Sequence, residues 1–186
     1  MKSNTNMKEN ILNVATNLIT VNGIRNTSLS DIAKTAGISK GTLYYHYSSK
    51  DDLIFDIADN HLKIITDAVL DCVYSIESKC SKDDLINIIM GKISTIGSTG
   101  RIHMYLLCEA ITGNEPLRER IKLKYIQWRT TLQEEINKYL HEDIDDSEAF
   151  SFLIISIVDG LVVQSILKTE EIPFEKIASF LVNKWI

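Results

Sequence analysis

One short segment, residues 29–53 (LSDIAKTAGISKGTLYYHYSSKDDL), limits the possible folds of this chain more than any other feature. The apolar spacing of Leu29–Thr35 predicts a short helix. Gly37 then suits a tight turn, because glycine tolerates backbone angles that other residues avoid. Ser39 can begin a second helix, Lys40–Tyr47, with a polar and aromatic outer face. Two such helices joined by a glycine turn are typical of a helix-turn-helix that enters the DNA major groove, so the segment predicts DNA binding.

The same segment resembles the DNA-binding signature of TetR-type (tetracycline-repressor-like) bacterial transcriptional regulators. The resemblance rests on Ile11, Asn22, Gly23, Thr27, Ser28, Asp31, Ile32, Ala33, the run from Ala36 to Tyr47, Ser49, Lys50 and Leu53. This block lies within about a quarter of the chain, and beyond it the similarity rests on length, helix content, Tyr125 and Asp159-Gly160. Tyr47 is a small departure, since such proteins often carry phenylalanine there. The resemblance implies an all-α protein of about nine helices.

Helical periodicity along the rest of the chain agrees with that fold class, and no strand alternation interrupts it. Ser28 with Asp31, Ser49 with Asp52, and Ser81 with Asp84 have the spacing of capping boxes. Besides the two short helices, we expect helices at about Lys8–Asn22, Asp51–Ser78, Asp83–Ile96, Ile102–Thr112, Pro116–Leu140, Ser147–Lys168 and Pro173–Trp185, with a flexible GSTG linker at 97–100 and an acidic loop at 141–146. We expect a three-helix DNA-binding domain at residues 1–48 and a larger ligand-binding and dimerisation domain at residues 49–186.

The charge distribution predicts a small, focused DNA contact. The chain carries a net charge of −5, which argues against a general nucleic-acid binder. Residues 1–52 nevertheless hold six Lys and Arg and four Asp and Glu, for +2, while residues 53–186 sum to −7.

The resemblance also implies roles for individual residues of the DNA-binding segment. Lys40, Gly41 and Tyr44 would approach bases, and Tyr45, His46 and Lys50 would hold the DNA backbone. The expected interface further includes Thr27, Ser28, Ser39 and Thr42. The alternative places Tyr45 and Tyr47 in the core, which we prefer for Tyr47, and leaves Lys50 as a solvated lysine.

Polar residues on apolar helices mark candidates for a small-molecule chamber, which the resemblance implies in the second domain. The candidates are His61, Ile65, His103, Met104, Leu107, Tyr125, Ser156 and Asp159. The alternative is that each histidine is a hydrogen-bonded core residue, and for Trp128 we expect the core. A buried Asp159 needs a partner, which would be a cationic ligand, a Lys or Arg across an interface, or a hydrogen-bond donor.

The last two helices carry more apolar surface than one subunit covers, which predicts a homodimer through them. The residues expected in the interface are Phe152, Ile155, Val158, Val162, Val163, Ile166, Phe180, Leu181 and Trp185. A membrane span at residues 150–167 is disfavoured, because Asp159 and Gln164 interrupt the run.

The sequence contains no catalytic motif, phosphate loop or metal-ligand spacing, so we expect no enzyme, no cofactor and no metal site. Cys72, Cys80 and Cys108 form no CxxC pair and are expected to be reduced and mostly buried in a cytoplasmic protein. The first residues lack the apolar core of a secretion signal. We therefore expect a dimeric regulator, a repressor of a palindromic double-stranded DNA operator that an unknown small-molecule effector releases. The alternatives are a DNA-binding dimer without a ligand cavity, and a helical carrier or enzyme.

Overall fold

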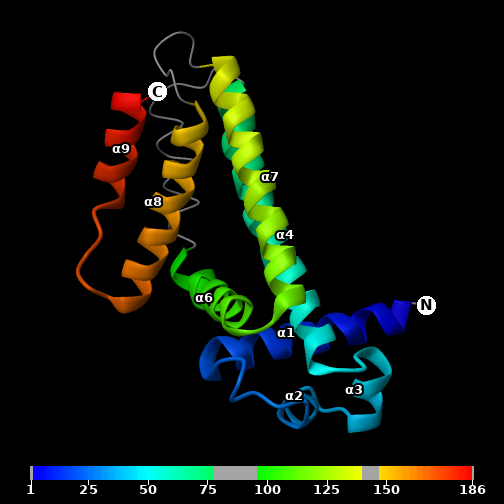
Figure 1. Cartoon of the computed structure of the whole chain (residues 1–186). Coiled ribbons are helices and arrows are strands. Elements are labelled where there is room, and N and C mark those ends of the chain that lie inside the picture. Colours follow the sequence, from blue (N-terminus) through cyan, green and yellow to red (C-terminus); the bar gives the residue numbers. More distant parts are fainter. Residues whose placement is uncertain (1, 78–95, 140–146, 186) are drawn as a thin grey trace. The chain divides into compact units, whose positions relative to one another are not determined.

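The computed structural model describes residues 2–77, 96–139 and 147–185, and within these ranges the chain is helical and contains no strand (Figure 1). The helices are α1 (Lys2–Asn22), α2 (Leu29–Thr35), α3 (Lys40–His46), α4 (Lys50–Glu77), α6 (Ile96–Thr112), α7 (Glu115–Tyr139), α8 (Ser147–Leu167) and α9 (Phe174–Trp185). The all-α class is confirmed. The expected helix at 83–96, apart from its last residue, the cap at Ser81 and the loop at 141–146 lie outside the described residues.

The chain divides into two compact units. The first contains Met1–Leu62 and Arg101–Glu119, and the second contains Lys63–Gly100 and Arg120–Ile186. Helices α4, α6 and α7 each contribute to both units. The expected domain boundary after residue 48 stays a prediction.

Two of the expected capping boxes are present. The Ser28 hydroxyl accepts the amide of Asp31, and an Asp31 carboxylate oxygen accepts the amide of Ser28 in return. Ser49 and Asp52 exchange the same pair of hydrogen bonds at the start of α4. These bonds satisfy amides that the first turn of a helix leaves without partners, so α2 and α4 begin where the sequence places them.

The turn between α2 and α3 depends on the positive φ of Gly37, which is +68°. Its amide donates to the carbonyl of Lys34, and the amide of Ile38 donates to the carbonyl of Ala33. This pair of bonds is a Schellman ending, which ends α2 and turns the chain toward α3. The expected glycine turn is confirmed.

The expected flexible linker at residues 97–100 is wrong, because these residues lie inside α6. Gly100 is buried against α8: a Cβ atom placed on it would lie 3.1 Å from Val162 Cγ1 and 3.3 Å from Ile166 Cδ1. The close packing of α6 and α8 explains why position 100 is a glycine. The low helix propensity of glycine alone does not reveal such packing.

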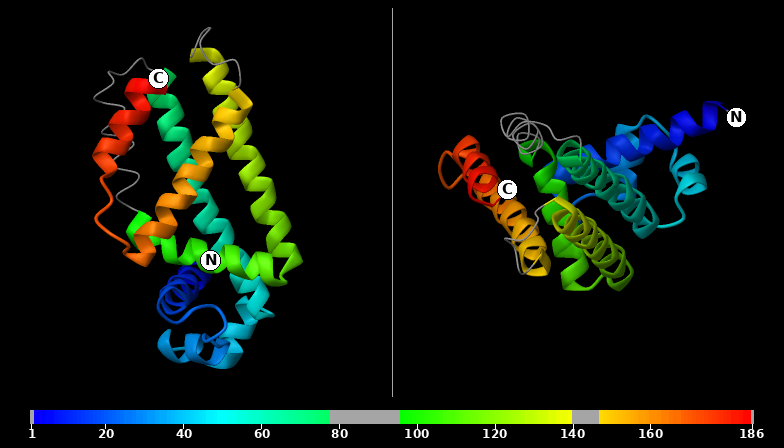
Figure 2. Two further views of the ribbon diagram at one scale, coloured as in Figure 1. Left: turned by 60° about the vertical axis from the view of Figure 1, so that its left-hand side comes forward. Right: turned by 90° about the horizontal axis from the view of Figure 1, so that it is seen from above.

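In the second unit, α7 is held by hydrogen bonds to its neighbours. The indole of Trp128 donates to the Thr66 hydroxyl of α4 at 2.8 Å, and Trp128 itself is buried, as expected. Tyr125, one turn earlier, has its ring 5.1 Å from that of Trp128. Helices α8 and α9 lie side by side in the views of Figures 1 and 2 and enclose an apolar groove between them.

Helix α8 has two different apolar faces. Phe150, Ser151, Leu161 and Val162 are buried. On the opposite side Phe152, Val163 and Leu167 stay exposed, and this spacing places them on one stripe of the helix. The prediction that Val162 lies in a subunit interface is wrong, since its side chain is buried within the protomer against Gly100.

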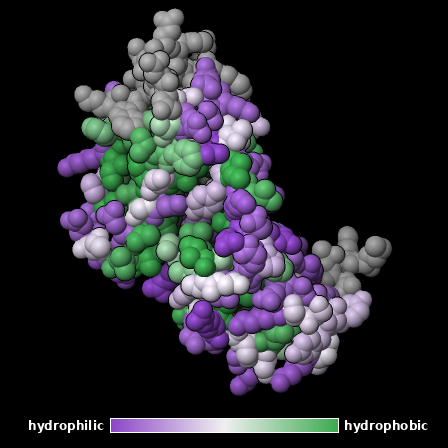
Figure 3. All heavy atoms as spheres, viewed as in Figure 1, coloured by the Kyte–Doolittle hydropathy of each residue, from purple (hydrophilic) through white to green (hydrophobic). Residues whose placement is uncertain are grey.

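Because of this second face, α8 is unusually apolar for a helix of which only a small part is buried. Among the described helices, α8 alone is long and apolar enough to span a membrane, with only 22% of its most apolar window buried. Figure 3 shows hydrophobic side chains gathered on the side of the molecule formed by α8 and α9.

Cys108 is exposed, so the expectation that the cysteines are buried is wrong for this residue. The side chains of Cys72 and Cys80 lie outside the described part of the structure. Position 108 lies on the outer face of α6, whose inner face is formed by Ile102, Leu106 and Ala110.

Candidate nucleic-acid interface

The helix-turn-helix is built on a core of fully buried aliphatic side chains. These are Ile11, Ala15 and Ile19 of α1, Ile32 and Ala33 of α2, Leu43 of α3, and Leu53, Ile54, Ile57 and Ala58 of α4. Their burial holds two seven-residue helices that are too short to persist alone in water.

Tyr47 fixes the end of α3 against α1 and α4. It is 2% exposed, as preferred over a DNA contact, and its amide caps α3 by donating to the carbonyl of Leu43. Its hydroxyl donates to the Asp56 carboxylate at 3.1 Å, and Lys8 pairs with the same carboxylate and lies over the Tyr47 ring. Burial, and then the charge of Asp56, raise the pKa of Tyr47 far above its usual range, so it remains a donor. The hydroxyl that phenylalanine would lack is therefore used in the core.

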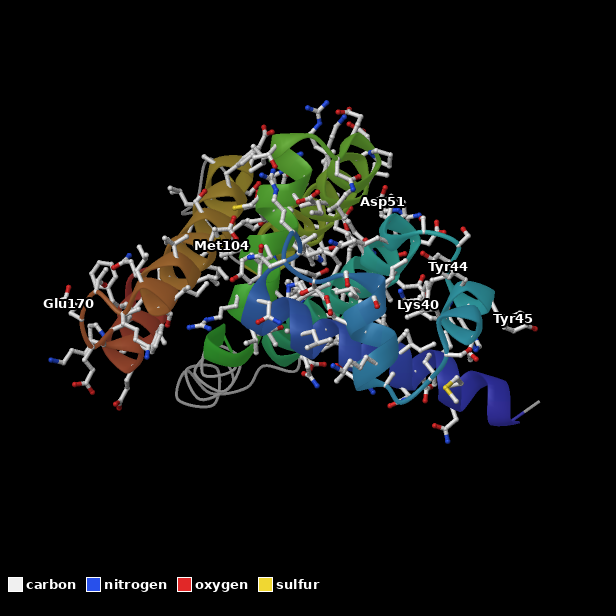
Figure 4. The ribbon with its side chains drawn as sticks, turned by 90° about the horizontal axis from the view of Figure 1, so that it is seen from below. Lys40, Tyr44, Tyr45, Asp51, Met104 and Glu170 are labelled. Carbon is white, nitrogen blue, oxygen red and sulfur yellow. The ribbon has the colours of Figure 1, made fainter. Side chains whose placement is uncertain are left out.

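The outer surface of α3 presents the residues expected to meet DNA. Lys40 and Gly41 are exposed, and the side chains of Tyr44 and Tyr45 are 55% and 76% exposed. Figure 4 shows Lys40, Tyr44 and Tyr45 on this one helix, with Tyr45 pointing away from the protein. Tyr45 is thus not a core aromatic.

Four further candidates lie around this surface, and their polar groups are partly engaged within the protein. The Ser39 hydroxyl accepts the amide of Thr42 and lies 2.9 Å from its hydroxyl, which fixes the first turn of α3. His46 ends the helix with its ring 5.2 Å from that of Tyr45. Ser28 is exposed, but its hydroxyl donates to the Asp31 carboxylate, so that carboxylate competes with any phosphate.

Two candidates have roles inside the protein that spacing does not reveal. Thr27 is 1% exposed, and its hydroxyl donates to the carbonyl of Gly23 at 2.9 Å. We therefore drop the Thr27 side chain from the expected phosphate contacts. The Lys50 ammonium group donates to the backbone carbonyl of Ile24, which joins the start of α4 to the turn before α2.

A surface hollow of about 380 Å³ opens between these elements, lined in part by Lys40, Tyr44 and Lys50. Its lining also includes Arg25, which sequence analysis missed. The missed signal was charge: Arg25 is one of only six basic residues in the first 52.

The candidate ligand residues fall into two separate groups. In the first unit, His61 of α4 and His103 of α6 are both buried, with His61 Nε2 and His103 Nδ1 3.1 Å apart. Each histidine is therefore a hydrogen-bonded core residue, as the alternative interpretation had it. Met104 and Leu107 on the same helix are half-buried.

In the second unit, the Tyr125 hydroxyl donates to the Asp159 carboxylate, 3.1 Å from both oxygens. A hydrogen-bond donor is thus one partner of Asp159, and burial followed by the carboxylate charge raises the pKa of Tyr125. Ile65 is half-buried in this unit. Ser156 is exposed on the stripe of Phe152 and Val163, so we drop it from the ligand candidates.

Comparisons with known proteins identify the N-terminal domain and the fold. Residues 11–57 match the family model described as bacterial regulatory proteins, tetR family. The chain is 26% identical over 178 residues to the HTH-type transcriptional regulator LmrA of Bacillus subtilis, covering 92% of this chain and 93% of LmrA. It is 27% identical over 155 residues to the biofilm operon negative transcriptional regulator IcaR of Staphylococcus epidermidis, covering 80% and 79% of the two chains.

Residues 11–57 thus form a TetR-family DNA-binding domain, and over most of its length the chain is similar to transcriptional regulators. The fold extends beyond the matched residues: a regulator from Saccharomonospora viridis, solved in complex with choline, superposes with a TM-score of 0.70 at 18% identity over 98% of this chain and 96% of its own. These relatives are regulators of transcription and not enzymes.

The buried His61 predicts an acid-sensitive free energy of unfolding. Burial, with a smaller contribution from His103, lowers the pKa of His61 to about 4, whereas an unfolded histidine titrates near its ordinary value of about 6.5. Between these values only the unfolded chain takes up the proton, so stability falls as the pH drops through this window. We expect the His61 contribution to fall by about 2 kcal/mol between pH 7 and pH 5.

Urea unfolding of the wild type and of His61→Gln at pH 7, 6 and 5 measures this effect. The variant lacks the titrating group and is expected to lose less stability on acidification. Equal pH dependence of the two proteins would contradict the assignment.

Proposed function

We propose that this protein is a dimeric repressor that binds a palindromic operator with two copies of α3 and is released by a small-molecule effector. The exposed surface of Lys40, Gly41 and Tyr44, on a helix anchored by the buried Leu43 and Tyr47, is the observation that carries the proposal. A rigid helix with an exposed polar and aromatic face suits direct readout of base edges. Repression is supported by IcaR, a negative regulator of transcription.

In this proposal Lys40, Gly41 and Tyr44 approach bases. Tyr45 and His46, with Ser39 and Thr42 at the helix start, contact the backbone. Gly41 matters because nothing beyond the Ser39 hydroxyl oxygen, 3.7 Å away, lies near the position of a Cβ, so the missing side chain leaves room for DNA. A DNA-binding regulator of this kind acts in the cytoplasm.

Dimerisation through α8 and α9 is supported by their second apolar face. Phe152 and Val163 of α8 are exposed on this face. Leu167 of α8 is 67% exposed and Phe180 of α9 is 58% exposed. Contiguous apolar surface of this kind is rare on monomers and marks an interface. A dimer also meets the geometric demand of an operator, whose half-sites lie about 34 Å apart along the duplex.

For the effector we propose a small organic cation, bound near Asp159 in the second unit. Tyr125 and Trp128 present two aromatic rings at 5.1 Å beside the Asp159 carboxylate, and aromatic faces with a carboxylate are the chemistry that recognises a quaternary ammonium group. The S. viridis regulator of the same fold, solved with choline, supports a ligand of this class. Such a ligand shifts DNA affinity only if it binds one conformer better than the other.

The DNA-contact proposal predicts that Tyr44→Ala and Lys40→Ala each weaken operator binding by about 1–3 kcal/mol, because each removes a base contact. Tyr74→Ala is the matched control, since Tyr74 is 58% exposed on α4 yet lies outside the helix-turn-helix. Fluorescence anisotropy with duplexes from the region upstream of the gene and its neighbours measures the affinities. Wild-type affinity in a folded Tyr44→Ala variant would refute the assignment.

The dimer proposal predicts that Phe180→Glu yields monomers, because a carboxylate in an apolar interface costs about 2–4 kcal/mol of association. Ile111→Glu, at a position 74% exposed on α6, is the control and should leave the dimer intact. Sedimentation velocity at micromolar concentration distinguishes the two. A wild-type protein that is monomeric there would overturn the proposal.

The effector proposal predicts that choline raises the melting temperature of the wild type and that Asp159→Asn weakens its binding about tenfold or more. Asp67→Asn, which removes an exposed carboxylate paired with Lys63, is the control. Thermal shift and calorimetry on the full chain measure both effects. If Asp159→Asn binds choline as tightly as the wild type, the role of Asp159 must be dropped; if choline and related quaternary ammonium ions leave the wild type unaffected, the cationic class is wrong.

A further inference from the structure

The hollow beside α3 is lined by three basic side chains, those of Arg25, Lys40 and Lys50. No carboxylate lines it, and its polar lining is completed by hydroxyl groups, including those of Ser30 and Tyr44. A concave site with several cations and hydroxyl donors suits a dianionic or monoanionic oxyanion such as a phosphate group. At about 380 Å³ it is large enough to receive one phosphodiester unit of a DNA strand.

Arg25 and Lys40 are both exposed and, within the described residues, neither has a hydrogen bond or ion pair, whereas Lys50 is half-buried. Lys40 begins α3 and is the proposed base contact, and Lys50 already donates to the carbonyl of Ile24. The planar guanidinium group is also the side chain that best matches a phosphate, since it donates two parallel hydrogen bonds.

Although Arg25 is exposed, hydrogen bonds hold the backbone on both sides of it. The hydroxyl of Thr27 donates to the Gly23 carbonyl, and its amide donates to the Ile24 carbonyl. The amide of Gly23 donates to the carbonyl of Ile19. Lys50 reaches across from α4 to the same Ile24 carbonyl, the peptide group that leads directly into Arg25. The loop is therefore fixed before any ligand arrives, which lowers the entropic cost of binding.

We infer that Arg25 binds a backbone phosphate of the operator at this hollow, and that Lys50 is a positioning residue that acts by holding the loop of Arg25. The inference rests on the proposed DNA-binding function and adds a contact to it. It reassigns Lys50, which the family resemblance had placed on the phosphate itself. Because a phosphate contact is blind to sequence, Arg25 adds affinity for any duplex and no base specificity.

The test compares wild type with Arg25→Gln on an operator duplex recovered by footprinting upstream of the gene and on a scrambled duplex of equal length. Arg25→Gln is expected to lower both affinities by the same factor, about tenfold, and to reduce the slope of log K against log salt by about 0.9. Arg101→Gln is the control, because it removes an equal charge from an exposed position on α6 outside the hollow. Arg25→Lys should keep most of the slope but bind several-fold more weakly, since it retains charge without the paired donors.

The outcomes separate this inference from the proposed function. If the wild type binds no upstream duplex, the DNA-binding proposal fails. If it binds and Arg25→Gln keeps the wild-type affinity and slope, the Arg25 contact alone is wrong. A loss confined to the operator, with the scrambled duplex unaffected, would also overturn the inference, because it would make Arg25 a base-reading residue.

Lys50→Gln and the double variant test the positioning role. If Lys50 acts through Arg25, Lys50→Gln lowers affinity and slope on its own but adds little to Arg25→Gln. Effects that multiply, with a slope reduced by about 1.8 in the double variant, would show that Lys50 holds a second phosphate itself. Thermal melts of each variant confirm that the helix-turn-helix remains folded.

Discussion

The surface proposed to face DNA depends on one buried contact, the packing of Tyr47 at the end of α3. A seven-residue helix has too few internal hydrogen bonds to persist alone. Tyr47 caps it, lies in the aliphatic core and donates its hydroxyl to Asp56 of α4, whose charge Lys8 of α1 compensates. Three helices thus meet at one side chain, and the exposed positions of Lys40 and Tyr44 follow from that anchoring.

The two units differ in how far they bury their apolar side chains. In the first, aliphatic side chains such as Leu43 and Leu53 are fully buried and hold a polar surface outward. In the second, α8 buries Phe150 and Leu161 but leaves Phe152 and Leu167 in water. An exposed apolar stripe of this kind gains stability when a second surface covers it, as the proposed dimer would do.

Local signals predicted the helix-turn-helix well because its determinants are local. The capping pair of Ser28 and Asp31 and the positive φ of Gly37 involve residues within a few positions of one another. The same local reasoning failed at residues 97–100, where a Gly- and Ser-rich run suggested a linker. Residues 97–100 are helical, and position 100 is a glycine because Val162 of α8 packs close to where a side chain would be.

The sequence by itself determined the fold class, the helix boundaries around the turn and the polar face of α3, since periodicity, caps and glycine act over a few residues. Only the tertiary structure decided which candidate side chains are already hydrogen-bonded within the protein. Thr27 and Lys50 are engaged with backbone carbonyls, and His61 meets His103 across 42 positions of sequence. Such pairings depend on how helices pack, and no spacing rule in a single chain encodes the distance between residues on different helices.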